Sequence, residues 1–216
     1  MMDSPKMIIK DTNSRFKRVL GEVLSQILNV PMLSGALVTI IFFRLPTDIP
    51  NRMAGFGWAL VFISLIPLTS LLFYIPGKVK DWAKIIKRQR TASFILMIIS
   101  YPVGFIVLKL INAPRIFEAI AVNYTLITLG LIIFNLILRY KASGHAAGVA
   151  GPVAAMFYFF GIPAVPLVAL IPLTIFARIA AKGHDLWQLV VGAVMSVSIT
   201  LLVLIMYGFN IFGQLH

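Results

Sequence analysis

The residues of this sequence best suited to chemistry include two histidines, each of which stands beside an apolar stretch. His145 follows Ser143 and Gly144 directly, at the start of a run rich in alanine and glycine. A helix that begins at Ser143 and Gly144 offers unpaired backbone N–H groups and the positive end of its dipole, and both favour a phosphate. The sequence therefore predicts an anion site beside an imidazole.

His184 is the second histidine, and it lies just before the last apolar stretch. Gln188 follows four residues later, a spacing that places the two side chains on one face of a helix. We therefore expect Gln188 to orient the imidazole. Ordinary packing at a membrane interface is the common role of a single histidine in such a place, but basic residues accompany both of these histidines.

A third basic segment, Lys84 to Arg90, leads into another apolar stretch. We expect this segment to be a loop between two membrane spans, and it includes Lys87 and Arg88.

The elements that must position these residues follow from composition. The chain has 216 residues, of which 60% are hydrophobic and 12% charged. The lipid interior offers no hydrogen-bond partners, so continuous apolar runs must cross it as helices. We therefore expect an all-α, polytopic membrane helical bundle with about six to seven transmembrane helices. The predicted spans are 30–45, 55–75, 92–112, 116–138, 146–161, 163–177 and 187–209.

The fifth and sixth of these spans are short, and the turn around Gly161 to Pro163 separates them. Together they are too long for one ordinary crossing, which favours a hairpin over a single kinked helix. Residues 15–28 have the apolar stripe of an amphipathic helix, which lies either at the membrane interface or against the bundle. We therefore divide the chain into 1–28, a polar segment with this helix, and 29–216, one membrane-embedded domain.

Lysine and arginine are distributed unevenly between the two predicted membrane faces. Fifteen fall on the face that carries both histidines, and four fall on the other face. This bias predicts a cytoplasmic amino terminus and a cytoplasmic basic face, in the cell membrane. The net charge of +12 favours anionic headgroups or phosphate-bearing substrates, and we expect no nucleic-acid partner. The absence of cysteine excludes disulfides and thiolate chemistry.

The three basic segments together resemble the signature of the type 2 phosphatidic acid phosphatase superfamily. That signature is a lysine and an arginine separated by six residues, then Ser-Gly-His, then Arg-x5-His-x3-Asp. The second and third elements match at 143–145 and at 178–184, in the same order along the chain. The predicted spans also bring all three segments to one membrane face. The resemblance covers about residues 78–192.

Two departures from the signature affect the predicted site. Lys84 and Arg90 have five intervening residues, and Thr91 stands where proline is usual. Gln188 stands in place of the closing aspartate. Its carbonyl can accept the same hydrogen bond but supplies no negative charge.

The resemblance implies a phosphatase that needs neither a metal nor another cofactor. His184 would attack phosphorus to form a phosphohistidine, and His145 would protonate the departing lipid oxygen and later activate water. Gln188 would orient His184. The groups implied to bind the substrate phosphate are Lys84, Arg88, Arg90, Ser143, Gly144 and Arg178, with Lys141 as a weaker candidate.

The substrate class implied is a phosphorylated lipid: phosphatidic acid, phosphatidylglycerophosphate or a prenyl (di)phosphate. If Gln188 disables catalysis, the protein would be a weak or inactive lipid-binding descendant of the family. A transporter or scramblase is a further alternative, with Glu118, Asn123 and Asn135 as candidate path-lining residues. A metal hydrolase is disfavoured, because Asp185 is the one acidic residue near the two histidines.

Overall fold

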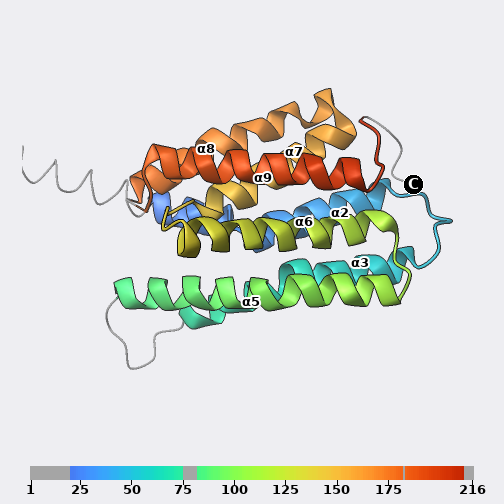
Figure 1. The fold of residues 1–216 in the computed structure, drawn as a ribbon, viewed down its shortest axis with the longest axis horizontal. Coiled ribbons are helices and arrows are strands. Elements are labelled where there is room, and N and C mark those ends of the chain that lie inside the picture. Colours follow the sequence, from blue (N-terminus) through green and yellow to red (C-terminus); the bar gives the residue numbers. More distant parts are fainter. Residues whose placement is uncertain (1–19, 75–81, 182, 212–216) are drawn as a thin grey trace, which may run out of the picture.

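The computed structural model describes residues 20–74, 82–181 and 183–211, and within these ranges it contains helices and no strands. Figure 1 shows the helices lying side by side along one long axis. Six of them are long and apolar enough to cross a membrane, and Gly144–Phe160 is a shorter apolar helix. The predicted all-α polytopic bundle is therefore confirmed.

The helices follow the predicted apolar stretches, and in two spans a short 3₁₀ or π-helical segment continues an α-helix. The elements are residues 20–27, α2 Val30–Arg44, α3 Arg52–Leu60, η1 Val61–Leu65, α4 Ile66–Leu68, η2 Thr69–Tyr74, α5 Trp82–Leu110, α6 Arg115–Ile132, η3 Ile133–Ile137, α7 Gly144–Phe160, η4 Ile162–Ala169, α8 Leu170–Ala180 and α9 Leu186–Met206.

The third predicted span begins ten residues too late. We expected a loop from 76 to 91, but α5 already begins at Trp82, so Lys84 to Arg90 are helical. No glycine or proline lies between Trp82 and Tyr101, so nothing in the sequence stops the helix there. Thr91, in the place where the signature usually has proline, is compatible with an uninterrupted helix.

The fifth and sixth spans form the predicted hairpin of two short helices. α7 ends at Phe160, and Gly161 turns the chain with a φ of 62° and a ψ of −131°. Only glycine adopts this conformation readily, because a Cβ would clash with the backbone. The chain then returns along α7 as η4 and α8.

Residues 20–27, the described part of the predicted amphipathic helix, pack against the bundle. A Cβ on Gly21 would overlap the backbone of Ala177 and Ala181, at the end of α8. Ser25 is buried, whereas Val23 and Ile27 are exposed on the outside. Of the two placements left open by the sequence, the described residues adopt the one against the bundle. Residues 15–19 of the predicted helix lie outside the described ranges.

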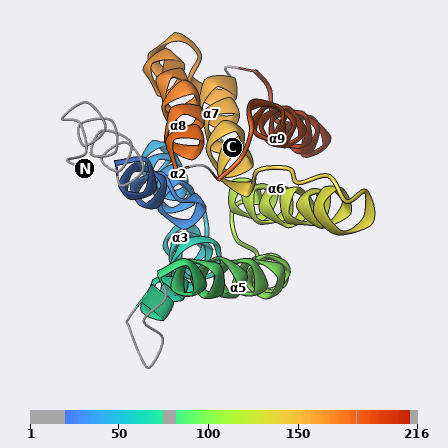
Figure 2. The same cartoon turned by 90° about the vertical axis from the view of Figure 1, so that its left-hand side faces the viewer.

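Helix α7 lies between α2, α8 and α9 when the bundle is viewed from one end (Figure 2). Small residues allow this close approach, as is usual between membrane helices. Gly148 packs against Val30 of α2, and Gly151 packs against Ser196 of α9. On α9, Gly192 packs directly against the backbone of Ser143, just before α7.

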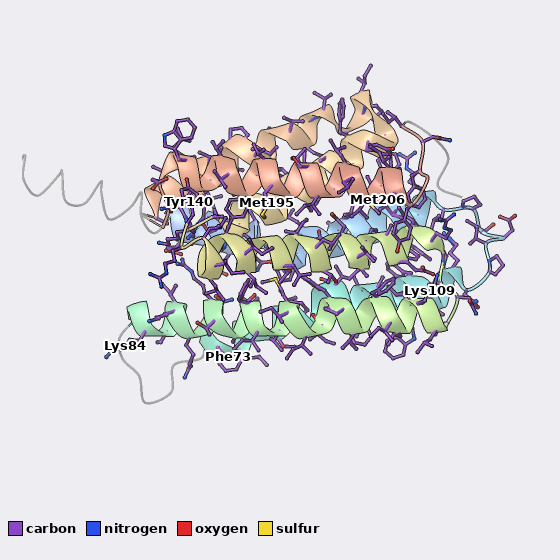
Figure 3. All side chains as sticks on the ribbon, viewed as in Figure 1. Phe73, Lys84, Lys109, Tyr140, Met195 and Met206 are labelled. Atoms are coloured by element: carbon purple, nitrogen blue, oxygen red, sulfur yellow. The ribbon has the colours of Figure 1, made fainter. Side chains whose placement is uncertain are left out.

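The described cations gather at the two ends of the bundle. Figure 3 shows Lys84 and Tyr140 near one end and Lys109 and Met206 near the other. We call the first the basic end. The described cations at the basic end are Lys84, Lys87, Arg88, Arg90, Arg139, Lys141 and Arg178. The sequence segments that carry the two histidines therefore emerge at one face of the bundle.

A methyl group at position 192 tests the close approach of α9 to Ser143. We expect Gly192→Ala to destabilise the protein by about 1–3 kcal/mol, because the new Cβ meets backbone atoms that cannot move alone. Gly57→Ala is the matched control, since a Cβ at Gly57 meets nothing within 4 Å. Unfolding by sodium dodecyl sulfate, followed by circular dichroism, measures both. Equal stability of the two variants would contradict this packing.

Candidate active site

The site is built around the start of α7, where Ser143 is the N-cap. Its hydroxyl accepts a hydrogen bond from the N–H of Ala146 at 3.4 Å. Its own N–H donates to the carbonyl oxygen of Gln188 at 3.0 Å, and its side chain is fully buried. Ser143, which the resemblance implies binds phosphate, thus caps α7 and connects it to the first turn of α9.

His145 is the second residue of α7 and lines a partly open cavity of about 330 Å³. Gly144 lines the same cavity. Three groups lie close enough to act on the His145 imidazole through their charge: Arg178, Arg90 and His184. The two histidines, which are 39 positions apart in the sequence, therefore belong to one electrostatic cluster.

His184 lies between α8 and α9, and its Nδ1 is 2.9 Å from Oε1 of Gln188. An amide oxygen can only accept a hydrogen bond, so Nδ1–H of the imidazole donates and the lone pair remains on Nε2. The neighbouring Asp185 has a different role, because its carboxylate accepts from the N–H of Gln188 at 2.9 Å and caps α9. Gln188 is thus the residue that orients His184.

Burial lowers the pKa of His184 to about 4, from an ordinary value of 6.5. The positive charges of Arg178, Lys141 and Arg90 act in the same direction, and the hydrogen bond to Gln188 opposes them. Neutral imidazole is therefore the form present at pH 7. A neutral ring with a free Nε2 is the form that can act as a nucleophile.

Arg178 is 1% exposed and is the largest of the fully buried side chains in the described residues. Its guanidinium lies against Gly183, where a Cβ would overlap it, so any larger residue there requires the guanidinium to shift. Its Nη1 donates to Oγ of Ser25 at 3.3 Å. Lys141 approaches Gly183 as well, donating from Nζ to the carbonyl oxygen at 3.2 Å. These contacts hold two cations beside the segment that carries His184.

Arg90 comes to the same cluster from α5 and lines the cavity next to His145. Its Nη2 lies 3.4 Å from Oε2 of Glu22, in the helical segment 20–27. The preceding residue, Gln89, is buried and donates to Oγ of Ser70 at 3.2 Å. Sequence reasoning missed Glu22 and Ser25 as neighbours of the site. Their separation by three positions, which puts them on one helical face, was the available signal.

Lys84 and Arg88, both implied phosphate ligands, do not line the cavity. Arg88 is about 200° from Arg90 around the axis of α5, so the two arginines face opposite ways. Lys84 and Arg88 line a separate groove on the surface of α5. The structure thus brings His145, His184 and Arg90 together and places this other pair elsewhere.

The cavity extends from the basic end toward the middle of the bundle. On α5 it is lined from Gln89 to Tyr101, which is about 18 Å along the helix axis. Polar residues gather at its outer end, beside apolar neighbours such as Leu71 and Leu136: Gln26, Asn29, Ser70, Gln89, Arg90, Asn135 and His145. Farther in, its walls are largely apolar, and they include Met97 and Ile127 as well as Tyr124. The cavity therefore has the amphipathic character of a lipid.

Within residues 20–74, 82–181 and 183–211, no group of three or more histidine, cysteine or acidic residues is placed to hold a metal ion. Comparison with known protein families, with curated proteins and with solved structures finds no match to this chain.

The hydrogen bond between His184 and Gln188 gives a titration test. We expect the His184 pKa near 4 in the wild type, and a rise of about one to three units in Gln188→Asp, because a carboxylate favours imidazolium. Gln188→Leu should lower the His184 pKa below that of the wild type, since it removes the hydrogen bond that opposes the effects of burial and of the nearby cations. The measurement is the pH dependence of the His184 ring signals by NMR in detergent. A wild-type midpoint at the ordinary histidine value would contradict the described environment.

Proposed function

We propose that this protein hydrolyses a lipid phosphate monoester or an isoprenyl (di)phosphate, through a phosphohistidine and without a metal ion. The observation that carries the proposal is the cluster of His145, His184, Arg90 and Arg178, of which His145 and Arg90 line an amphipathic cavity. The resemblance of these residues to the type 2 phosphatidic acid phosphatase signature supports the same reaction.

In the first step, Nε2 of His184 attacks phosphorus while the bond from phosphorus to the lipid oxygen breaks. His145 donates a proton to that oxygen, so a monoester leaves as a neutral alcohol. For an isoprenyl diphosphate the attack is on the terminal phosphorus, the bond to the bridging oxygen breaks, and the leaving group is the isoprenyl monophosphate. Burial lowers the pKa of His145, and the nearby arginine charges lower it further. The negative charge of the bound phosphate opposes the arginine charges and so favours protonation of His145 when the substrate is present. Arg90 and Arg178 stabilise the charge on the phosphoryl oxygens.

In the second step, His145 accepts a proton from water, and the hydroxide attacks the phosphohistidine. The bond between phosphorus and Nε2 breaks, inorganic phosphate leaves, and His184 returns to its neutral form. Gln188 holds the ring in one orientation throughout by accepting from Nδ1–H. Because an amide has no negative charge, Gln188 stabilises the positively charged ring of the intermediate less than an aspartate would.

The cavity accounts for the choice of a lipid as the substrate. A phosphate held near His145 and Arg90 places the attached chain along the apolar walls toward Tyr101. The cavity is about 18 Å long on α5, which exceeds half of a hydrocarbon core of about 30 Å. A long apolar chain therefore has room inside the bundle while its phosphate stays at the basic end. Small, fully polar phosphate esters are disfavoured as substrates, because they would leave the apolar walls of the cavity without a partner.

We further propose that the basic end faces the cytoplasm and that the protein resides in the cell membrane. The support for this orientation is the excess of lysine and arginine at that end, since such residues are retained on the cytoplasmic side.

Phosphate release in the presence of a chelator tests the reaction. We expect hydrolysis of phosphatidic acid or an isoprenyl diphosphate by the wild type and none by His184→Ala, which lacks the nucleophile. Gln188→Asp should have equal or higher turnover, because a carboxylate stabilises the charged intermediate. Equal release by wild type and His184→Ala would refute the mechanism. An inactive wild type with an active Gln188→Asp would identify a lipid-binding relative of an enzyme, and lipid flux that survives His184→Ala would favour transport.

A pair of arginine substitutions tests which cations bind the phosphate. We expect Arg90→Gln to lower kcat/KM by about 10²–10³, the usual effect of removing one donor to a developing oxyanion. Arg139→Gln is the matched control, because Arg139 is an exposed cation of the basic end that does not line the cavity. Its kcat/KM should stay close to the wild-type value. Equal losses in both variants would indicate a general effect of surface charge.

A further inference from the structure

A second groove lies on the outer surface of α5, away from the cavity. One wall consists of a single stripe of α5, and the other consists of two residues of η2. Its lining residues are Thr69, Phe73, Lys84, Lys87, Arg88, Thr91, Ala92, Ile95 and Leu96. The α5 members recur at intervals of three and four positions, which makes them one continuous helical face.

This face changes character along the helix. Its first two turns carry three exposed cations, Lys84, Lys87 and Arg88. Two turns farther into the membrane the same face carries Ile95, which is 51% exposed, and Leu96. The order, cations at the basic end and apolar side chains below, is the order of headgroup and acyl chain in one leaflet.

The η2 wall fixes one of the cations in place. Arg88 donates from Nη2 to the carbonyl oxygen of Phe73 at 2.9 Å, and its guanidinium lies 5.7 Å from the centre of the Phe73 ring. A guanidinium carries five N–H donors, so this one bond leaves others to face the groove. The Phe73 ring, 42% exposed, adds an apolar surface beside the aliphatic residues of α5.

We propose that this groove binds one anionic phospholipid of the surrounding bilayer, with its phosphate among Lys84, Lys87 and Arg88. The acyl chain lies along Ile95, Leu96 and Phe73. Among the described residues, three cations and no acidic residue line the groove, so the charge of this lining complements an anionic headgroup. This lipid is separate from the substrate, because Arg90 and the cavity lie on the opposite side of α5.

The proposal does not depend on the phosphatase reaction, because it concerns residues outside the cluster of the two histidines. The signature implied that Lys84 and Arg88 bind the phosphate of the substrate. In the groove they would bind the phosphate of a bilayer lipid instead. The three cations are exposed at a helix end that lies where lipid headgroups are found. A lipid from the same leaflet therefore reaches them without entering the bundle.

Native mass spectrometry of the full chain in a neutral detergent tests the proposal, with phosphatidylglycerol and phosphatidylcholine of identical acyl chains as probes. We expect tight binding of one phosphatidylglycerol and much weaker binding of phosphatidylcholine. Lys87→Gln should weaken the phosphatidylglycerol site about five-fold, and the triple variant Lys84→Gln, Lys87→Gln, Arg88→Gln should weaken it by about two orders of magnitude. Arg139→Gln, which removes an exposed cation outside the groove, should leave the affinity unchanged.

Two further measurements distinguish a lipid bound in this groove from a free phosphate ligand and from a lipid bound in the cavity. Glycerol 3-phosphate, which has the anion but no acyl chain, should not displace the lipid; displacement at similar concentration would overturn the assignment to a bilayer lipid. If Arg90→Gln abolished binding while the triple variant retained it, the lipid would occupy the cavity and the proposal would be wrong. Circular dichroism of each variant verifies the fold, and Lys87→Gln alone leaves the contact of Arg88 with Phe73 intact.

Discussion

The arrangement of the candidate site depends on one backbone hydrogen bond, from the N–H of Ser143 to the carbonyl oxygen of Gln188. It joins the start of α7 to the first turn of α9. His145 follows Ser143 by two residues, and His184 precedes Gln188 by four, so the bond fixes both imidazoles relative to each other. Gly192 makes the bond possible, because a side chain there would occupy the space of the Ser143 backbone. The polar groups of the site are thus positioned by a close contact between two membrane helices.

Much of the fold could be predicted because a membrane reduces the possible structures. Apolar runs must form helices, and their number and order then determine which segments share a face. The hairpin at Gly161 followed from the turn residues Gly161 to Pro163 and from the combined length of the two spans. The start of α5 could not be predicted in the same way, because the basic segment looked like a loop by composition although no residue in it stops a helix. Because that segment is helical, Arg88 and Arg90 face opposite sides of α5. Their spacing of two residues implies this only when the segment is known to be a helix.

The site was predictable to a lesser degree. The pairing of His184 with Gln188 is a local property, since the two residues are four positions apart, and the sequence indicated it. His184 precedes α9, so the contact joins the segment before the helix to its first turn. The contacts of Arg90 with Glu22 and of Arg178 with Ser25 join residues far apart in the chain, and no local pattern specifies them. The cavity depends on how residues from 20–27, α2, η2, α5, α6 and α7 pack together. Ser143 also shows the difference: its type and position suit a phosphate ligand, but the structure uses its hydroxyl to cap α7.

The ion pair between Glu22 and Arg90 has a consequence for any anion that approaches the cavity. The arginine, whose side chain is 37% exposed, already has a carboxylate beside it, so an anion that binds there competes with Glu22. Exchange of one anion for the other leaves the local charge nearly balanced before and after, which reduces the electrostatic cost of each state. Since Glu22 belongs to residues 20–27, the exchange also changes what holds that segment against α5. An anion bound in the cavity would therefore weaken one contact of residues 20–27 with α5, while the contact of Ser25 with Arg178 would remain.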